Sequence, residues 1–136
     1  MLAVMRERHF TLEEATALLP WLEETFAAMM PIRNELVEWQ ERLLMLLRRR
    51  RSNGHSSQDE ALSEAQQAVD RLTRQLQDWV REIVREGIEV RDVGRGLVDF
   101  PSLREGREVY LCWLRGEAEI GYWHETDRGF DHRQPL

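Results

Sequence analysis

The chain has 136 residues, a formal net charge of −6 and a hydrophobic fraction of 42%. This length fits one domain, or a helical arm joined to a small lobe. The acidic balance argues against a nucleic-acid binder, which needs a basic face to displace counterions from phosphates. The single cysteine, Cys112, excludes an intrachain disulfide. No stretch approaches the roughly 20 apolar residues of a membrane span, so a cytoplasmic protein is expected.

The pattern predicts a first helix over about residues 11–50. Thr11 and Glu14 have the spacing of a capping box, which satisfies free backbone N–H groups at a helix start. An apolar series with heptad spacing then runs without interruption through Ala15, Leu22, Met29, Leu36 and Leu43. Pro20 and Pro31 each remove a helical hydrogen bond. We expect a kink at each proline, with a break at Pro20 as the alternative.

A second helix is predicted over about residues 58–86 and ends at Gly87. Its apolar side chains alternate in steps of three and four, as a coiled-coil seam requires. The series comprises Leu62, Ala65, Val69, Leu72, Leu76, Trp79 and Ile83. The polar stretch between the helices predicts a loop, in which Ser56 or Ser57 caps the second helix. Residues 1–87 are therefore predicted to form an antiparallel two-helix coiled-coil hairpin.

The first helix has more apolar surface than a two-helix seam uses. Met30, Val37 and Leu44 form an additional line beside the main series. Surplus apolar surface has to meet another surface, either the C-terminal part of the chain or a second subunit. We favour a homodimer, because twofold oligomers are the commonest assemblies. Its predicted seam consists of Leu36, Leu43, Leu62, Val69, Leu72, Leu76, Trp79 and Ile83.

After Gly87 the apolar period changes from helical to two, which predicts an antiparallel β-lobe over residues 88–136. Strands are expected at 88–93, at 97–100 where Pro101 stops the strand, at 109–114 and at 119–124. Gly116 and Glu117 suit a two-residue type II′ hairpin turn. The fold class is therefore α+β.

That hairpin turn fixes a register. Leu111 then faces Tyr122 and Val109 faces His124, and this face is assigned to the core. Cys112 lies on the opposite face from His124, which disfavours a nucleophilic Cys–His pair. A small buried apolar residue is the favoured role for Cys112.

The segment after the last predicted strand is rich in imidazole and carboxylate groups. Such groups bind divalent transition metals or activate water. The candidate ligands are His124, Glu125, Asp127 and His132, together with Asp99, which is placed to pair with an arginine or to orient His124. The favoured alternatives are a capping loop with a partly buried histidine, and a turn aspartate that accepts backbone N–H groups.

Aromatic and arginine residues also gather in the predicted β-lobe. They suggest a surface for a planar anionic ligand or a partner peptide, with a hydrophobic core and dimer surface as the favoured alternative. The candidate surface comprises Tyr110, Trp123, Arg107, Arg115, Arg128 and Arg133.

Strings at both ends of the chain resemble one family. They are RHFTLEEATALLP near the start, and DFP, LCW, EIGYWH, GF and RQPL near the end. Together they resemble the prokaryotic family catalogued as domain of unknown function 2203. The resemblance implies the division into helices and sheet and a prokaryotic intracellular setting, and it brings no catalytic residues with it.

The sequence has no glycine-rich phosphate loop, nucleophile elbow or paired-cysteine metal site. This favours a non-catalytic oligomeric interaction or assembly module, with no clearly implied cofactor. The alternative is a small metal- or ligand-dependent enzyme with its site around His124, for which a divalent metal is the candidate cofactor.

Overall fold

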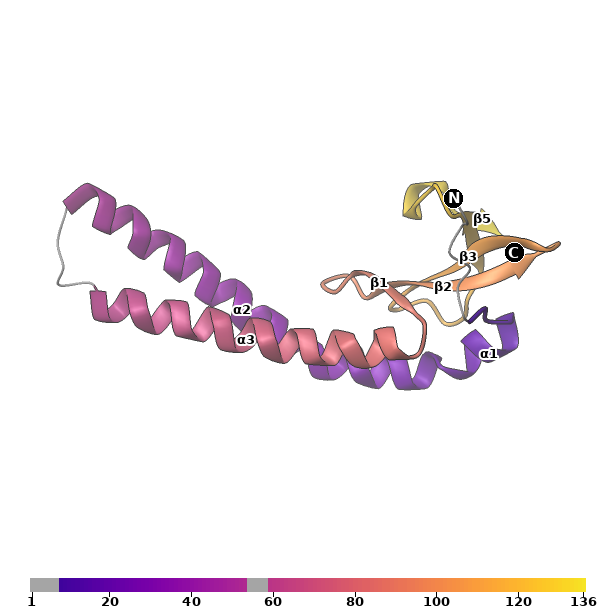
Figure 1. The fold of residues 1–136 in the computed structure, drawn as a ribbon, viewed down its shortest axis with the longest axis horizontal. Coiled ribbons are helices and arrows are strands. Elements are labelled where there is room, and N and C mark those ends of the chain that lie inside the picture. Colours follow the sequence, from indigo (N-terminus) through magenta and orange to yellow (C-terminus); the bar gives the residue numbers. More distant parts are fainter. Residues whose placement is uncertain (1–7, 54–58) are drawn as a thin grey trace, which may run out of the picture. The chain divides into compact units, whose positions relative to one another are not determined.

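The structure, a computed structural model, describes residues 8–53 and 59–136 (Figure 1). It confirms the α+β class, with long helices followed by an antiparallel sheet. The helices are α1 (Leu12–Ala17), α2 (Leu19–Asn53) and α3 (Asp59–Arg85). The strands are β1 (Glu89–Asp92), β2 (Leu97–Arg104), β3 (Arg107–Leu114), β4 (Tyr122–Glu125) and β5 (Gln134–Pro135). The loop predicted between the long helices, with its Ser56 or Ser57 cap, lies outside the described residues.

The start of the first predicted helix is confirmed, but the helix is interrupted. Thr11 accepts a hydrogen bond from the Glu14 N–H, and the Glu14 carboxylate accepts one from the Thr11 N–H. The chain leaves the helix at Leu18, and Pro20 is the second residue of α2. Proline is tolerated there because the first N–H groups of a helix have no intrahelical partner. The predicted kink at Pro20 is therefore wrong and the alternative break is right, whereas α2 continues through Pro31.

The predicted seam is buried in part, and most of its remaining residues are half-buried. Leu36 of α2 and Leu72 of α3 are buried. Leu46 is buried while Leu47 is 43% exposed. Trp79 is 38% exposed and lies at the margin of the seam. Within residues 8–53 and 59–136, no helix combines the length and the apolar content needed to cross a membrane.

The chain divides into two compact units. One contains Ala27–Trp79, the greater part of the two long helices. The other contains the described residues up to Phe26 together with Val80–Leu136. The first turns of α2 and the end of α3 thus belong with the sheet, whereas the sequence suggests a division after residue 87. Gly87 ends the helical part as predicted, with a φ of +92° and its N–H donated to the Val84 carbonyl.

The five strands form one antiparallel sheet in the order β1-β2-β3-β4-β5. β2 does not stop at Pro101, as predicted, but continues to Arg104. The last pair between β1 and β2 joins Glu89 to Asp99, so among the strands of the described residues β3 alone neighbours β2 at Pro101. A proline without an N–H is tolerated where one side of the strand has no ladder to complete. The Pro101 carbonyl accepts a hydrogen bond from the N–H of Phe10.

The predicted register between the last two long strands is wrong by one residue. Val109 pairs with Glu125, and Leu111 pairs with Trp123. The cause is the connection, because residues 115–121 form a loop instead of a two-residue turn. A shift of one residue moves every side chain of β4 to the opposite face. Tyr122 and His124 therefore leave the face of Val109 and Leu111.

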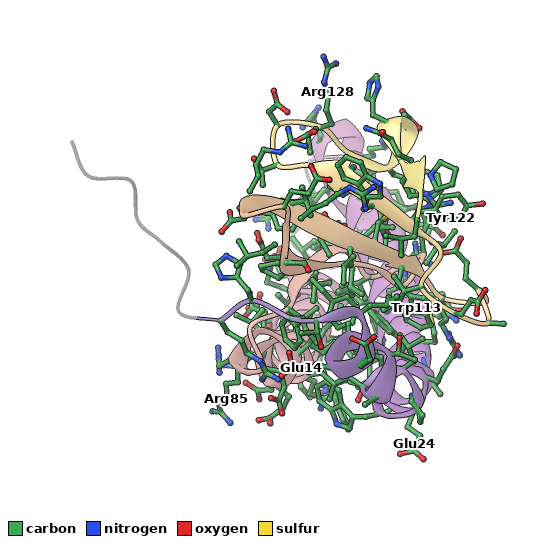
Figure 2. The ribbon with its side chains drawn as sticks, turned by 90° about the vertical axis from the view of Figure 1, so that its right-hand side faces the viewer. Glu14, Glu24, Arg85, Trp113, Tyr122 and Arg128 are labelled. Atoms are coloured by element: carbon green, nitrogen blue, oxygen red, sulfur yellow. The ribbon has the colours of Figure 1, made fainter. Side chains whose placement is uncertain are left out.

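The two faces of the sheet differ in character. One face carries Val98, Phe100, Leu111, Trp113 and Trp123, all buried. Phe10 packs on this face, with its ring edge-on to that of Phe100 at 5.2 Å. The other face carries polar and ionisable groups. Figure 2 shows Trp113 on the side of α1 and its Glu14, and Tyr122 with Arg128 on the other side of the sheet.

Candidate metal centre

Three neighbouring strands bring three buried side chains together on the polar face of the sheet. Asp99 of β2 lies directly opposite Cys112 of β3. His124 of β4 lies opposite Tyr110 and is thus the diagonal neighbour of Cys112. Each of the three can offer one metal-ligand atom, and these atoms all lie within 4.8 Å of one another. The exposed fractions are 2% for Asp99, 1% for Cys112 and 1% for His124.

Both ring nitrogens of His124 are engaged. Nδ1 lies 2.8 Å from the carbonyl oxygen of Glu125. Because a carbonyl only accepts hydrogen bonds, Nδ1 carries a proton and donates it. Nε2 lies 2.9 Å from Oδ1 of Asp99, which is also an acceptor when ionised. Either one proton or a cation in its place has to lie between Nε2 and Oδ1.

Arg91 of β1 completes the surroundings of Asp99. Its Nε donates to Asp99 Oδ2 at 2.8 Å, while its Nη2 lies 3.3 Å from Glu89 Oε1. The guanidinium carbon lies 5.0 Å from the centre of the Tyr110 ring. These contacts fix the orientation of the Asp99 carboxylate, so that Oδ1 faces His124.

Cys112 is not an activated nucleophile in this arrangement. Burial, and next the charge of Asp99, raise the pKa of its thiol to about 12. Arg133 acts in the opposite direction, with a smaller effect on this pKa. A thiol needs a base to become a nucleophile, and neither ring nitrogen of His124 is left over for that task. The geometry therefore disfavours a Cys–His pair, although the two side chains share one face and do not lie on opposite faces as predicted.

The C-terminal segment covers this part of the sheet and is held by Arg133. The Arg133 Nη1 lies 3.0 Å from each carboxylate oxygen of Glu117. Its guanidinium carbon also lies 4.1 Å from the ring centres of Tyr122 and Phe130. The Glu117 carboxylate in turn accepts the backbone N–H of Leu114. Arg133 thus joins the C-terminal segment to the β3–β4 loop beside Cys112.

A pocket of about 380 Å³ lies next to the three side chains. Asp99 and Cys112 form part of its wall, whereas His124 does not reach it. The remaining lining residues are Arg91, Leu97, Thr126, Asp127, Arg128, Gly129 and Phe130. The cluster of Asp99, Cys112 and His124 thus has the sheet on one side and a cavity large enough for a small molecule on the other.

The donor set suits a borderline-soft divalent ion such as Zn²⁺. Imidazole nitrogen, thiolate and carboxylate oxygen are its usual protein ligands, and bond lengths of about 2.0–2.3 Å place tetrahedral ligands roughly 3.3–3.7 Å apart. The 2.9 Å separation of Nε2 from Oδ1 would have to widen by about half an ångström to meet this requirement. The bond from His124 Nδ1 to a backbone carbonyl is the usual outer-shell contact of a metal-binding histidine.

The structure brings together only two of the predicted metal ligands, Asp99 and His124. Glu125 points to the opposite face of the sheet, where it pairs with Arg107 at 2.9 Å. Asp127 is exposed at the pocket wall, and His132 is exposed in the 3₁₀ turn η2 (Phe130–His132). The sequence cluster after β4 is therefore not one site, because the strand alternation and the loop separate its members.

The predicted aromatic and arginine surface does not exist as one surface. Tyr110 and Trp123 are both buried and lie on opposite faces of the sheet. Arg107 pairs with Glu125, Arg115 with Glu23 and Arg133 with Glu117. Arg107 and Arg128 are exposed, and Arg128 projects away from the sheet (Figure 2). The one-residue register difference is the physical reason for this separation.

Sequence reasoning missed Cys112 and Arg91 as members of the site. The predicted register places Cys112 on the opposite face from His124 and so excludes it from the site. Arg91 had a usable signal, since residues 88–91 alternate between apolar and charged residues, which places Arg91 on one face with Glu89. What the sequence lacked was the pairing of Glu89 with Asp99, which brings Arg91 to the aspartate.

A family model with the description "Uncharacterized conserved protein (DUF2203)" matches residues 8–136. No curated protein and no solved structure matches the chain. Four of the strings that carry the resemblance each supply one residue to the region described above: Asp99 from DFP, Cys112 from LCW, His124 from EIGYWH and Arg133 from RQPL. With nearly its whole length matched, the chain belongs to the DUF2203 family.

Proposed function

We propose that this protein binds one divalent transition-metal ion, with zinc as the best fit, through Asp99, Cys112 and His124. The observation that carries the proposal is the convergence of three different ligand atoms within 4.8 Å at a buried position. A buried charged group needs a partner, and a metal ion satisfies the carboxylate and the imidazole at once. It also replaces the proton that must otherwise lie between Nε2 and Oδ1.

The position of the pocket favours a reactive metal over a purely structural one. Structural zinc sites have four protein ligands, whereas catalytic sites have three and leave one position for water or substrate. Here three protein ligands adjoin a cavity of about 380 Å³. A metal ion bound there polarises a ligand or lowers the pKa of a bound water. Arg91 holds Asp99 in position, and the Glu125 carbonyl fixes the tautomer of His124.

Metal binding can be tested on the purified protein. Elemental analysis should find close to one equivalent of metal, and titration of chelator-treated protein with Co²⁺ should produce a thiolate-to-cobalt absorption band. Cys112→Ser should abolish this band while the circular-dichroism spectrum keeps its helical form. His132→Gln is the matched control, since this exposed histidine lies outside the cluster and its variant should retain the band.

Zinc should also stabilise the folded chain, because only the folded state assembles the three ligands. At a hundredfold excess over Kd, the expected gain is about 3 kcal/mol in the free energy of unfolding. Urea denaturation with and without Zn²⁺ measures this gain in the wild type and in Cys112→Ser. A wild type that takes up no metal and gains no stability would show that Arg91, Asp99 and His124 are a structural ion-pair network.

A second candidate function, an oligomeric assembly module, is favoured by a separate observation in the helical unit. Leu44, Met45 and Leu47 of α2 are between 43% and 49% exposed. Leu44 and Leu47 are three residues apart and so share one face of the helix. We propose that a second copy of the chain covers this face. The two proposals are independent, because Leu44 and Leu47 belong to one compact unit and the metal ligands to the other.

A further inference from the structure

The pocket beside the metal ligands has a size and a lining that indicate the chemistry of its ligand. Its volume of about 380 Å³ is at the small end of the range for metabolite sites. Phe130 is an apolar residue of its lining, and Thr126 and Gly129 also belong to the lining. Two arginines, Arg91 and Arg128, belong to the same lining.

Arg91 has donor capacity that the protein does not use. Asp99 and Glu89 engage its Nε and Nη2, and for Nη1 the described part of the chain provides no hydrogen bond. Its side chain is 40% exposed although it borders buried groups. A guanidinium that is fixed in position, with an unused edge, binds carboxylate or phosphate oxygens well. Arg128 is also exposed, and within the described residues its side chain has no ion pair.

The charged groups of the pocket wall favour an anion beside a bound metal. Without a metal, the proton between His124 Nε2 and Asp99 Oδ1 leaves this pair neutral overall. A divalent ion bound by the Asp99 carboxylate and a Cys112 thiolate forms a neutral centre. Among the other charged lining residues, Arg91 and Arg128 outnumber Asp127, while Glu89 pairs with Arg91 from outside the lining. An anion in the pocket therefore meets the open position of the metal and the Nη1 of Arg91.

We propose that the pocket binds a small oxyanion, a carboxylate or a phosphate, which takes the open position of the metal and pairs with Arg91. This inference rests on the proposed metal centre, because the metal supplies the open position. The oxyanion bridges the metal and the guanidinium, and Phe130 limits the size of the group attached to it.

Cobalt-loaded protein provides the test, since the visible d–d bands of Co²⁺ change when an anion enters its coordination sphere. Acetate and inorganic phosphate are titrated in separate arms, which distinguish a carboxylate site from a phosphate site. Acetamide is the matched neutral ligand for acetate. We expect a saturable spectral change at millimolar or lower concentration with one of the two anions and none with acetamide.

The contribution of Arg91 is measured with Arg91→Gln. This variant should bind the anion at least about tenfold more weakly, while the thiolate-to-cobalt band persists. Arg85→Gln is the charge-matched control, because Arg85 is 67% exposed on α3 and pairs with Glu82. It should leave anion affinity unchanged. If Arg91→Gln loses cobalt, Arg128→Gln takes its place, and a severalfold weaker anion affinity is expected.

The outcomes separate the two proposals. A wild type with no thiolate-to-cobalt band overturns the metal centre and the oxyanion site together. A wild type that binds cobalt but shows no spectral change with acetate or phosphate overturns the oxyanion site alone. An equal response to acetamide, or an equal loss of affinity in Arg85→Gln, also overturns it, because neither result involves the Arg91 guanidinium.

Discussion

The thiol of Cys112 is 1% exposed and has a pKa raised to about 12, first by burial and then by Asp99. Only the thiolate reacts with alkylating reagents, and at pH 8 a thiol of this pKa is ionised in roughly one molecule in ten thousand. We therefore predict that Cys112 in the chelator-treated, folded protein reacts with iodoacetamide at least roughly a hundredfold more slowly than in urea.

Mass spectrometry measures this rate without ambiguity, because Cys112 is the only cysteine of the chain. Reduced protein is labelled for increasing times in buffer and in denaturing urea, and the mass increase reports one modification. Equal rates in the two conditions would contradict the buried position of the thiol. They would also remove Cys112 from the set of proposed metal ligands.

At the scale of elements, the capping box of α1 makes a prediction about pH. Hydrogen bonds from the backbone and the side chain of Thr11 lower the pKa of Glu14 from 4.5. A carboxyl group whose pKa is lower in the folded than in the unfolded state stabilises the fold at every pH above its unfolded pKa. This stabilisation is lost as the pH falls from 4.5 through the lower pKa of the folded state. Glu14→Gln should therefore destabilise the protein at pH 7 and show a weaker loss of stability on acidification than the wild type.

Urea denaturation between pH 7 and pH 3 checks this prediction. Glu13→Gln is the matched control, since Glu13 also lies in the first turn of α1 but is not part of the capping box. Thr11→Ala removes the other half of the box and should cost about 1 kcal/mol at pH 7. If Glu14→Gln and the wild type lost the same amount of stability between pH 7 and pH 3, the capping box would not form in solution.

The elements that sequence predicted well are those whose signals are local. The capping box, the heptad spacing of α3 and its end at Gly87 depend on residues within a few positions of one another. The register of β4 depends on the loop instead. There Glu117 accepts the Leu114 N–H and binds Arg133, and its carbonyl accepts the Trp113 indole N–H. Arg133 is sixteen residues away along the chain, so no local pattern around Gly116 reveals the contact that stabilises the longer loop.

The candidate site was only half predictable for the same reason. Residue type identifies Asp99 and His124 as candidates, and Asp99 is expected to pair with an arginine or to orient His124. Their connection to Cys112 and Arg91 required the correct pairing of four strands. A one-residue difference in one pair was enough to place Cys112 on the wrong face. Residue chemistry therefore identified candidates, whereas the long-range strand pairing decided which of them meet.

At the scale of the whole molecule, the division into two units separates the proposed chemistry from the proposed assembly. Asp99, Cys112 and His124 belong to the unit with the sheet, and Leu44 and Leu47 belong to the helical unit of Ala27–Trp79. A change on the exposed face of α2 should therefore alter assembly without altering metal binding. A change at a metal ligand should have the opposite effect.

The double variant Leu44→Glu with Leu47→Glu tests the assembly. If a second copy covers this face, the wild type should be a dimer at tens of micromolar in light scattering, and the variant should be a monomer with the same helical circular dichroism. Leu72→Asp is the contrasting variant, because Leu72 is buried within the hairpin and a carboxylate there should cost about 3–5 kcal/mol. It should therefore unfold helix, whereas the double variant should not. A monomeric wild type at this concentration would contradict the assembly proposal, and cobalt binding by that monomer would leave the metal centre as the function that the fold supports.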